Sequence, residues 1–212
     1  MFITFEGIDG CGKSTQLDML AEVLETRGYE VLKVREPGAT PLSEAIREIL
    51  LSVKHTITPV AEMMLFAASR AQLVETVIRP ALQSGKIILC DRFIDSTTAY
   101  QGYGRGISLD NIKKCNEIAT NGLLPVRTYF LDISPECAKT RFQGQSLDRM
   151  ERAGEEFFKR VRDGYNVIAV EQPERIVKLD AERSIGELHE GILRDMMRCF
   201  EQNKAAEIMV KA

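Results

Sequence analysis

The segment GIDGCGKST, residues 7–15, has the composition and spacing of a loop that binds phosphate. Gly7, Gly12, Lys13 and Ser14 fit a pattern in which backbone N–H groups surround a phosphate, a lysine approaches the outer phosphates and a hydroxyl reaches Mg²⁺. A strand-like FITFE precedes the loop and a helix-like QLDMLAEVL follows it, which is the context that such a loop requires. The segment therefore predicts nucleotide binding.

The charges within this loop are unusual for an anion site. Asp9 places a carboxylate there, and the variable positions carry no arginine, although phosphoryl transfer needs more positive charge than Lys13 alone supplies. A GTPase is disfavoured, because VKLD at 177–180 begins with valine where the guanine-reading motif has asparagine, and CDRF lacks the glycine of DxxG. A small phosphotransferase remains, and it needs a second anion pocket for the acceptor.

Candidate residues for that pocket follow two predicted strands and lie on one predicted helix. Asp91 and Arg92 end the run GKIILCDRF, and Arg35 and Glu36 end YEVLKVREPG, so they should meet where parallel strands open onto a crevice. Arg92 is suited to grip phosphate, and Asp91 to hold Mg²⁺ through water.

Residues 58–85 predict one long helix that begins at Thr58-Pro59 and ends near Gly85. Glu62, Phe66 and Arg70 recur along one side of it. Arg70 falls in an apolar arc and needs a partner there, which is either an internal carboxylate such as Glu62 or a ligand. We favour the ligand, because an aromatic ring one turn away suits a planar polar base.

These side chains are positioned by an alternation of strands and helices. Five short apolar runs, FITFEG, YEVLKVREPG, GKIILCDRF, VRTYFLDIS and ERIVKLDAE, predict a mostly parallel sheet with helices on both faces. A length of 212 residues fits one α/β domain, residues 1–212. Residues 140–165 are polar and arginine-rich, and we interpret them as a surface lid, with a solvated helix pair as the alternative.

Composition narrows the partners and the compartment. The 44% apolar and 28% charged content is typical of a soluble globular protein, and the net charge of −3 argues against general binding to nucleic acid or to an anionic membrane. The five cysteines are scattered and form no CxxC pair, which favours reduced thiols. With no recognisable signal peptide or membrane span, we expect a cytoplasmic enzyme.

Taken in order, the motifs FEGIDGCGKST, REPGATPLSEAIREILL, LFAASRAQ, DRFIDSTTAYQG, LDRME and ERIVKLDA resemble those of thymidylate kinases and cover nearly the whole chain. The resemblance implies a P-loop nucleoside-monophosphate kinase fold, a five-stranded parallel sheet flanked by helices with a small mobile lid at about 141–153. It implies phosphorylation of dTMP to dTDP with Mg²⁺ and ATP, and a homodimer. A related kinase for another nucleotide or nucleoside is the alternative, as is a catalytically silent nucleotide-binding adaptor.

The resemblance also implies roles for particular residues. The ATP site comprises Gly7, Ile8, Asp9, Gly10, Cys11, Gly12, Lys13, Ser14, Thr15 and Arg141, with Arg141 packed on adenine. The dTMP site comprises Asp9, Glu36, Arg47, Phe66, Arg70, Arg92, Thr97, Tyr100 and Gln101, with Asp9 facing the acceptor sugar. Ser14 and Asp91 are the expected metal ligands. The chain departs from the family at Ala39, where a second glycine is common, and at STT, which replaces paired serines.

The charge absent from the phosphate loop is expected in the lid. Thymidylate kinases carry a key arginine either in the phosphate loop or in the lid, and Gly10 occupies the loop position here. The catalytic set is therefore predicted as Lys13, Asp9, Arg92, Arg149 and Arg152. Arg149 is the first choice, since LDRME follows the loop-like QGQS; the alternative is a surface ion pair with Asp148 or Glu151.

Overall fold

A computed structural model describes residues 1–141 and 148–211, with side chains described as far as residue 201. Within these residues the five predicted runs form one sheet whose ladders are all parallel, in the order β2-β3-β1-β4-β5. The strands are β1 (Phe2–Glu6), β2 (Val31–Arg35), β3 (Ile87–Asp91), β4 (Arg127–Asp132) and β5 (Ile176–Asp180). The predicted α/β fold is therefore confirmed. Because β1 pairs directly with β3, the segments that follow these two strands leave the sheet side by side.

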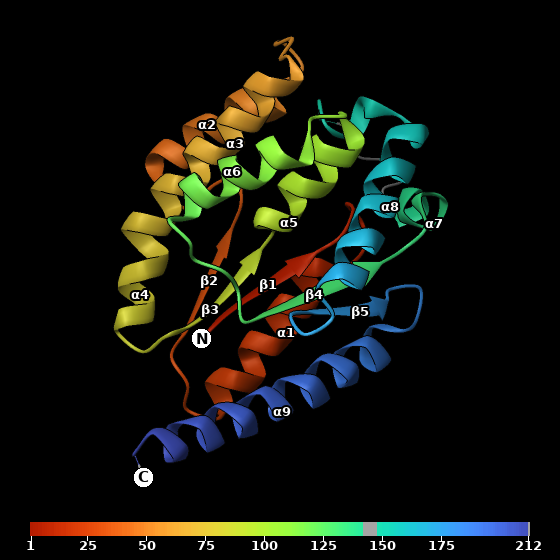
Figure 1. Ribbon diagram of the computed structural model, residues 1–212. Helices are drawn as coiled ribbons and strands as arrows, with labels where there is room; N and C mark the ends of the chain where they lie inside the picture. Colours follow the sequence, from red (N-terminus) through yellow and green to blue (C-terminus); the bar gives the residue numbers. More distant parts are fainter. Residues whose placement is uncertain (142–147, 212) are drawn as a thin grey trace.

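Helices connect consecutive strands and cover both faces of the sheet (Figure 1). The α-helices are α1 (Lys13–Thr26), α2 (Pro41–Leu51), α3 (Pro59–Leu73), α4 (Arg79–Gln83), α5 (Ile94–Thr97), α6 (Leu109–Thr120), α7 (Pro135–Arg141), α8 (Glu155–Glu171) and α9 (Ile185–Lys211). Two π-helical segments, η1 (Val74–Ile78) and η2 (Thr98–Gly104), and one 3₁₀ turn, η3 (Glu151–Ala153), complete the described elements. None of the helices in the described part of the chain is long and apolar enough to cross a bilayer.

Alternation along the strands divides the core between the two faces. Ile3 and Phe5 of β1 pack in one cluster with Leu20 of α1 and Ile192 of α9. Phe2, on the opposite face of the same strand, packs with the helical segment that contains Leu73 and Ile78. Figure 1 shows α1 and α9 on one side of the sheet and α3, α5, α6 and α8 on the other. Buried residues of α8, such as Val161, belong to the first cluster as well, so that cluster extends to both sides of the sheet. The sheet is thus held between two layers of helices, which fixes its strand ends.

The helix predicted over residues 58–85 begins at Thr58-Pro59, as expected, but it is not a single α-helix. It is divided into α3, the π-helical segment η1 and α4. Pro80 has no N–H group to donate to the fourth residue before it, so the regular ladder is interrupted at this point. The N–H of Arg79 instead donates to the carbonyl of Val74, which is the five-residue spacing of a π-helix.

The interpretation of residues 140–165 as a surface lid is wrong for its second half. Glu155 begins α8, and Phe157, Val161 and Tyr165 of this helix are buried in the core. Residues 142–147, which include the whole segment QGQS, lie outside the described residues. The error arose because charged side chains on the exposed face of α8 concealed apolar residues at helical spacing.

Candidate functional site

The phosphate loop leaves the carboxyl end of β1 in a conformation that depends on glycine. Gly7 has φ of 137°, and a Cβ atom at this position would lie 2.6 Å from the carbonyl oxygen of Leu131 in the neighbouring strand β4. Gly12 has φ of 95° and immediately precedes α1. The loop can therefore pass close to β4 and deliver its N–H groups to the start of α1, where the helix dipole favours an anion.

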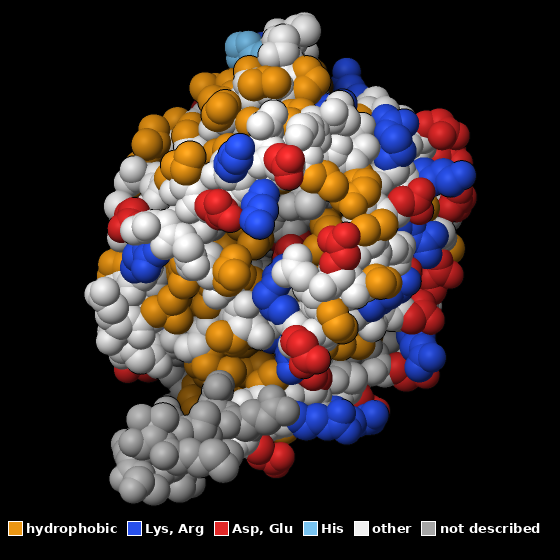
Figure 2. All heavy atoms as spheres, viewed as in Figure 1, with side chains coloured by type: hydrophobic (Ala, Val, Ile, Leu, Met, Phe, Trp, Pro, Cys, Tyr) orange, Lys and Arg blue, Asp and Glu red, His pale blue; other side chains and the backbone are white. Residues whose placement is uncertain are grey.

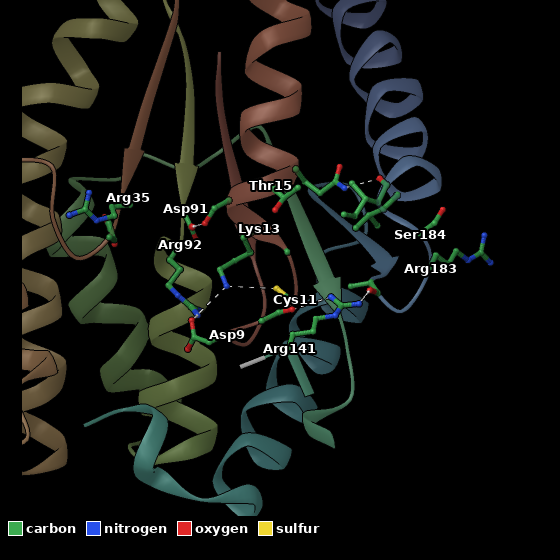
Figure 3. A pocket seen from close by; sticks show the side chains of 18 of the residues that line it. Asp9, Cys11, Lys13, Thr15, Arg35, Asp91, Arg92, Arg141, Arg183 and Ser184 are labelled. Atoms are coloured by element: carbon green, nitrogen blue, oxygen red, sulfur yellow. Dashed lines mark hydrogen bonds and ion pairs between the residues drawn. The ribbon is translucent and has the colours of Figure 1, made fainter. Parts of the chain in front are cut away.

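A cavity of about 680 Å³ opens above this loop. Residues Asp9 to Gln16 line it, whereas Gly7 and Ile8 of the predicted ATP set do not, because Ile8 is buried in the core. Six cationic side chains also line the cavity: Lys13, Arg35, Arg47, Arg92, Arg141 and Arg183. The charge that the loop itself lacks is therefore gathered from several elements around it (Figure 3).

Lys13 and Arg141 are held against backbone carbonyls of the loops around this cavity. The Nζ atom of Lys13 donates to the carbonyls of Gly7 and Ile8, both at 3.2 Å. The guanidinium of Arg141 bridges the phosphate loop and the segment after β5, with bonds to the carbonyl oxygens of Gly10 at 3.0 Å and Ala181 at 2.9 Å. Both cations are thus prepositioned beside the space where phosphates would lie.

Ser14 and Asp91 form the predicted pair at the mouth of the same cavity. The Oγ of Ser14 donates to Oδ2 of Asp91 at 2.9 Å. The other carboxylate oxygen, Oδ1, is buried and receives no hydrogen bond from any described residue. A carboxylate with a free oxygen beside a hydroxyl is a donor set that Mg²⁺ accepts, so these residues fit the expected metal.

Asp9 and Arg92 connect the phosphate loop to the end of β3. The Nη2 atom of Arg92 lies 2.5 Å from Oδ1 of Asp9, while Nζ of Lys13 lies 3.9 Å from the same oxygen (Figure 3). Burial alone would raise the pKa of the Asp9 carboxyl, but the two cations and a hydrogen bond from Tyr100 lower it to about 2. Asp9 is therefore an ionised hydrogen-bond acceptor at neutral pH.

Arg92 itself is held in a strained backbone conformation by Glu6. Its φ is 72°, in the left-handed region that side chains other than glycine rarely adopt. Oε1 of the buried Glu6 accepts from the N–H of Phe93 at 2.7 Å, and Oε2 accepts from Ser96 at 2.6 Å and Tyr165 at 2.9 Å. The carboxylate of β1 thus anchors the turn that aims Arg92 at Asp9.

A second, smaller cavity of about 90 Å³ lies next to the first. Every residue of the predicted dTMP set lines it: Asp9, Glu36, Arg47, Phe66, Arg70, Arg92, Thr97, Tyr100 and Gln101. Four of these, Asp9, Glu36, Arg47 and Arg92, line the larger cavity as well. The structure therefore places two adjoining cavities against one shared cluster of charged side chains.

The structure corrects the expectation that ligand is the main polar partner of Arg70. Arg70 is 1% exposed, and its guanidinium forms an ion pair with Glu36 at 2.6 Å. It also donates to Thr97 and Asn116 and to the backbone carbonyl of Phe93, each at 2.9 Å. Glu62, the alternative partner, instead binds Gln101, Arg105 and Arg149. Direct contact between Arg70 and a base would require that one of these protein bonds be exchanged.

The carboxylate of Glu36, the other partner of this ion pair, is buried as well. The Oε1 atom of Glu36 is buried and receives no hydrogen bond from any described residue. Burial raises the pKa of the Glu36 carboxyl, although the Arg70 cation and its hydrogen bond act in the opposite direction. Glu36 thus lines both cavities with one carboxylate oxygen bound to Arg70 and the other buried without a donor.

Arg149 is paired neither with Asp148 nor with Glu151, so the alternative of a surface ion pair with these neighbours is wrong. Its Nη1 atom lies 2.6 Å from Oε2 of Glu62, which is only 1% exposed, and its Nε donates to the carbonyl of Leu50 at 2.7 Å. Arg149 is thus attached to α2 and α3 and does not line the phosphate cavity. Arg152 instead borders a third hollow, which it shares with Asp9 and Phe158.

Several residues of the site were missed by sequence reasoning. Arg183 lines the phosphate cavity, and Glu6, Ser96 and Tyr165 hold the turn of Arg92. Glu6 carried a usable signal, since it is a lone acid at the end of an apolar strand. The others had none, because their partners are distant in the sequence.

Comparison with known proteins adds independent information. Residues 5–192 match the family described as thymidylate kinase. The chain is 53% identical over 207 residues to the thymidylate kinase of Prosthecochloris aestuarii, covering 93% of each chain. It is 51% identical to that of Chlorobaculum tepidum, covering 91% of this chain and 95% of the relative.

A solved structure agrees with these relatives. The crystal structure of thymidylate kinase from Ehrlichia chaffeensis superposes with a TM-score of 0.77 and 35% identity, covering 92% of this chain and 98% of the other. The fold is therefore that of a P-loop nucleoside-monophosphate kinase, as the phosphate loop and parallel sheet indicated. With a family match over most of its length and close full-length relatives, the chain belongs to the thymidylate kinase family.

Proposed function

We propose that this thymidylate kinase transfers the γ-phosphoryl group of Mg²⁺-bound ATP to dTMP across the boundary between the two cavities. The observation that carries the proposal is that Asp9 and Arg92 line both the larger cavity beside the phosphate loop and the smaller cavity. ATP phosphates would occupy the larger cavity and dTMP the smaller one. The attacking and leaving oxygens would then meet beside Arg92.

The acceptor phosphate has to be oriented, but it does not need a general base to deprotonate it. A nucleotide phosphate has its second pKa near ~6 and is mostly a dianion at neutral pH, so it is already nucleophilic. Arg92 would hold this phosphate, with Arg47 beside it, and Asp9 would accept a hydrogen bond from the acceptor sugar. Since Asp9 is ionised, with its pKa lowered to about 2, it also neutralises part of the Arg92 charge until substrate binds.

The smaller cavity would hold the thymine ring and its deoxyribose. Phe66 offers an aromatic face for stacking, and Thr97, whose oxygen accepts from Arg70, retains its own hydroxyl proton as a donor. Tyr100 closes the sugar side and would disfavour a 2′-hydroxyl. Arg70 would act on the base through Thr97 or after exchanging one of its bonds.

Mg²⁺ would be held by Ser14 and Asp91, directly or through water. When bound, the metal would neutralise charge on the β- and γ-phosphates of ATP. Lys13 would leave the carbonyls of Gly7 and Ile8 and approach the outer phosphates, and the N–H groups of Gly10 to Thr15 would surround the β-phosphate. Arg141 would support the adenine ring.

The lid arginines are proposed to complete the positive charge around the transferring group. The proposal is supported by Arg152 lining the same hollow as Asp9 of the phosphate loop. Arg149 would have to release Glu62 before it could contribute. Arg92, Arg47 and Lys13 already line the larger cavity. Their charges would therefore stabilise the bound phosphates in the ground state as well as in the transition state.

We also propose that the enzyme is a cytoplasmic homodimer. Exposed apolar side chains occur on the adjacent helices α3 and α6, where Met64 is 55% exposed and Ile118 82%. Figure 2 shows hydrophobic side chains gathered over α2 and α3. Burying such a surface against a second copy would remove it from water. Sedimentation velocity of the full chain would test this, with a monomer as the contrary result.

The acceptor assignment is tested by an ADP-release assay across dTMP, dUMP, dCMP, AMP, GMP and thymidine. We expect dTMP to give the highest kcat/KM. Equal or faster turnover of AMP or GMP would contradict the assignment, and turnover of thymidine alone would indicate a nucleoside kinase. ATP binding without turnover of any acceptor would indicate a silent adaptor.

A further inference from the structure

Glu62 binds three side chains from different parts of the chain, one of which, Gln101, lines the smaller cavity. Its Oε1 accepts from Nε2 of Gln101 at 2.9 Å and from Nε of Arg105 at 3.1 Å. Its Oε2 accepts from Nη2 of Arg105 at 3.2 Å and pairs with Nη1 of Arg149 at 2.6 Å. Glu62 itself does not line the cavity, so it acts through these neighbours.

The charge on Glu62 determines how Gln101 must be oriented. Burial would raise the pKa of the Glu62 carboxyl, but hydrogen bonds from Arg105, Gln101 and Arg149 outweigh it and lower the pKa. An ionised carboxylate only accepts hydrogen bonds. The side chain of Gln101 can therefore face it only with its NH₂ group, and rotating the amide by half a turn would place two acceptor oxygens together.

The carbonyl oxygen of the Gln101 amide, Oε1, is left to accept a hydrogen bond from a ligand. Gln101 is almost fully buried but lines the smaller cavity together with Phe66 and Thr97. No described residue donates a hydrogen bond to its Oε1. A buried carbonyl oxygen gains most from a donor on the molecule that fills the cavity, because water is displaced there.

We propose that Glu62 is a positioning residue that fixes the amide of Gln101 with its carbonyl oxygen toward the acceptor base, so that the cavity selects a pyrimidine carrying an N3–H group. Thymine and uracil carry this proton, whereas N3 of cytosine is an acceptor and would oppose the carbonyl oxygen. This inference rests on the proposed function, since it assumes that dTMP occupies this cavity. It explains discrimination by ring edge, which stacking on Phe66 cannot provide.

The test compares kcat/KM for dTMP and dCMP in the full-length enzyme and in Glu62→Gln. An amide at position 62 can either accept from or donate to Gln101, so both orientations become available. We expect the preference for dTMP over dCMP to fall by roughly tenfold or more, the scale of one reversed hydrogen bond. Arg105→Lys is the matched control, because it disturbs the same cluster without removing the carboxylate, and the preference should persist.

A double variant separates positioning from a general loss of structure. Gln101→Leu should lose the same preference as Glu62→Gln, and combining the two should cause no further loss. If Glu62→Gln retains the preference within twofold, or if the losses multiply, Glu62 does not act through Gln101. If Glu62→Gln fails to fold, Glu62→Asp takes its place: the shorter carboxylate withdraws from Gln101, and an unchanged preference again overturns the proposal.

A substrate probe tests the same point in the unaltered enzyme. N3-methyl-dTMP lacks the N3–H group, and we expect its kcat/KM to be at least tenfold below that of dTMP. Equal turnover would overturn the proposal. Failure of the unaltered enzyme to turn over dTMP would instead contradict the proposed function, so the two failures are distinguishable.

Discussion

Replacing Arg70 by methionine tests how the buried ion pair with Glu36 contributes to stability. The substitution conserves most of the side-chain volume but removes every N–H donor. It leaves the Glu36 carboxylate, 3% exposed, without its cation, and it also deprives Asn116 and the carbonyl of Phe93 of their bonds. Breaking a buried pair by removing one partner costs about 3–5 kcal/mol, because the remaining charge is buried without compensation.

This loss is large compared with the stability of a typical domain, about 5–15 kcal/mol. For a chain of this size, each kcal/mol lowers Tm by about 2–4 °C, so Tm of Arg70→Met should fall by about 6–20 °C. Urea unfolding followed by circular dichroism at pH 7 measures the free energy directly. The destabilisation should be larger at pH 8 than at pH 5, because an unpaired Glu36 is protonated more readily at low pH.

The matched control is Glu36→Leu/Arg70→Met, which removes both charges and should recover much of the lost stability. Activity should fall in both variants, because the cavity residue Thr97 loses the donor that holds it. A loss below about 1 kcal/mol for Arg70→Met, with normal activity, would refute the reasoning. Normal stability with a raised dTMP KM would instead restore the view that ligand is the main partner of Arg70.

Three further variants probe other parts of the site. Gly7→Ala should lower the free energy of unfolding by about 1–3 kcal/mol and weaken ATP binding, since its Cβ would lie 2.6 Å from the carbonyl oxygen of Leu131; unchanged urea unfolding and ATP titrations would contradict this. The pKa of Glu6 is raised from 4.5 to about 7, chiefly by burial and then by Asp95, so its contribution to stability is greatest below pH 4.5 and is lost as pH rises to about 7. The difference in unfolding free energy between the unaltered chain and Glu6→Gln should therefore shrink over that interval, and a pH-independent difference would count against it. Arg149→Ala should lower kcat about 10²-fold if this arginine reaches the phosphoryl group, and it should lower Tm because Glu62 loses a partner; a lower Tm with normal kcat would leave Arg149 only an anchoring role.

The sequence was most informative where function depends on short, contiguous segments. The phosphate loop could be predicted because Gly7, Gly12 and Lys13 belong to one short contiguous segment. The five strands could be predicted because apolar runs recur between helices. The charges at the ends of β2 and β3 followed from the rule that parallel strands open at one edge. These predictions need no knowledge of contacts between distant residues.

The errors arose where a side chain has partners far away in the sequence. Arg70 could be recognised as needing a partner, but its ion pair with Glu36 spans 34 residues. A ligand was expected instead, with the closer Glu62 as the alternative. Arg149 was expected to reach the phosphoryl group, with an ion pair to its sequence neighbours as the alternative, yet it binds a carboxylate on α3. Helix pattern determines which face a residue occupies, whereas the packing of one element on another determines which charge it meets.

The hydrogen bonds that Glu62 makes to Gln101 and Arg149 limit how this enzyme can diverge in sequence. One carboxylate binds both Gln101, which lines the smaller cavity, and Arg149, which attaches its segment to α2 and α3. A substitution of Glu62 therefore alters both the orientation of Gln101 and the anchoring of Arg149 at once. A substitution of Gln101 or Arg149 alone leaves Glu62 constrained by the other. Natural variants are expected to replace these three residues jointly, so that acceptor preference and the anchoring of residues 148–153 are inherited together.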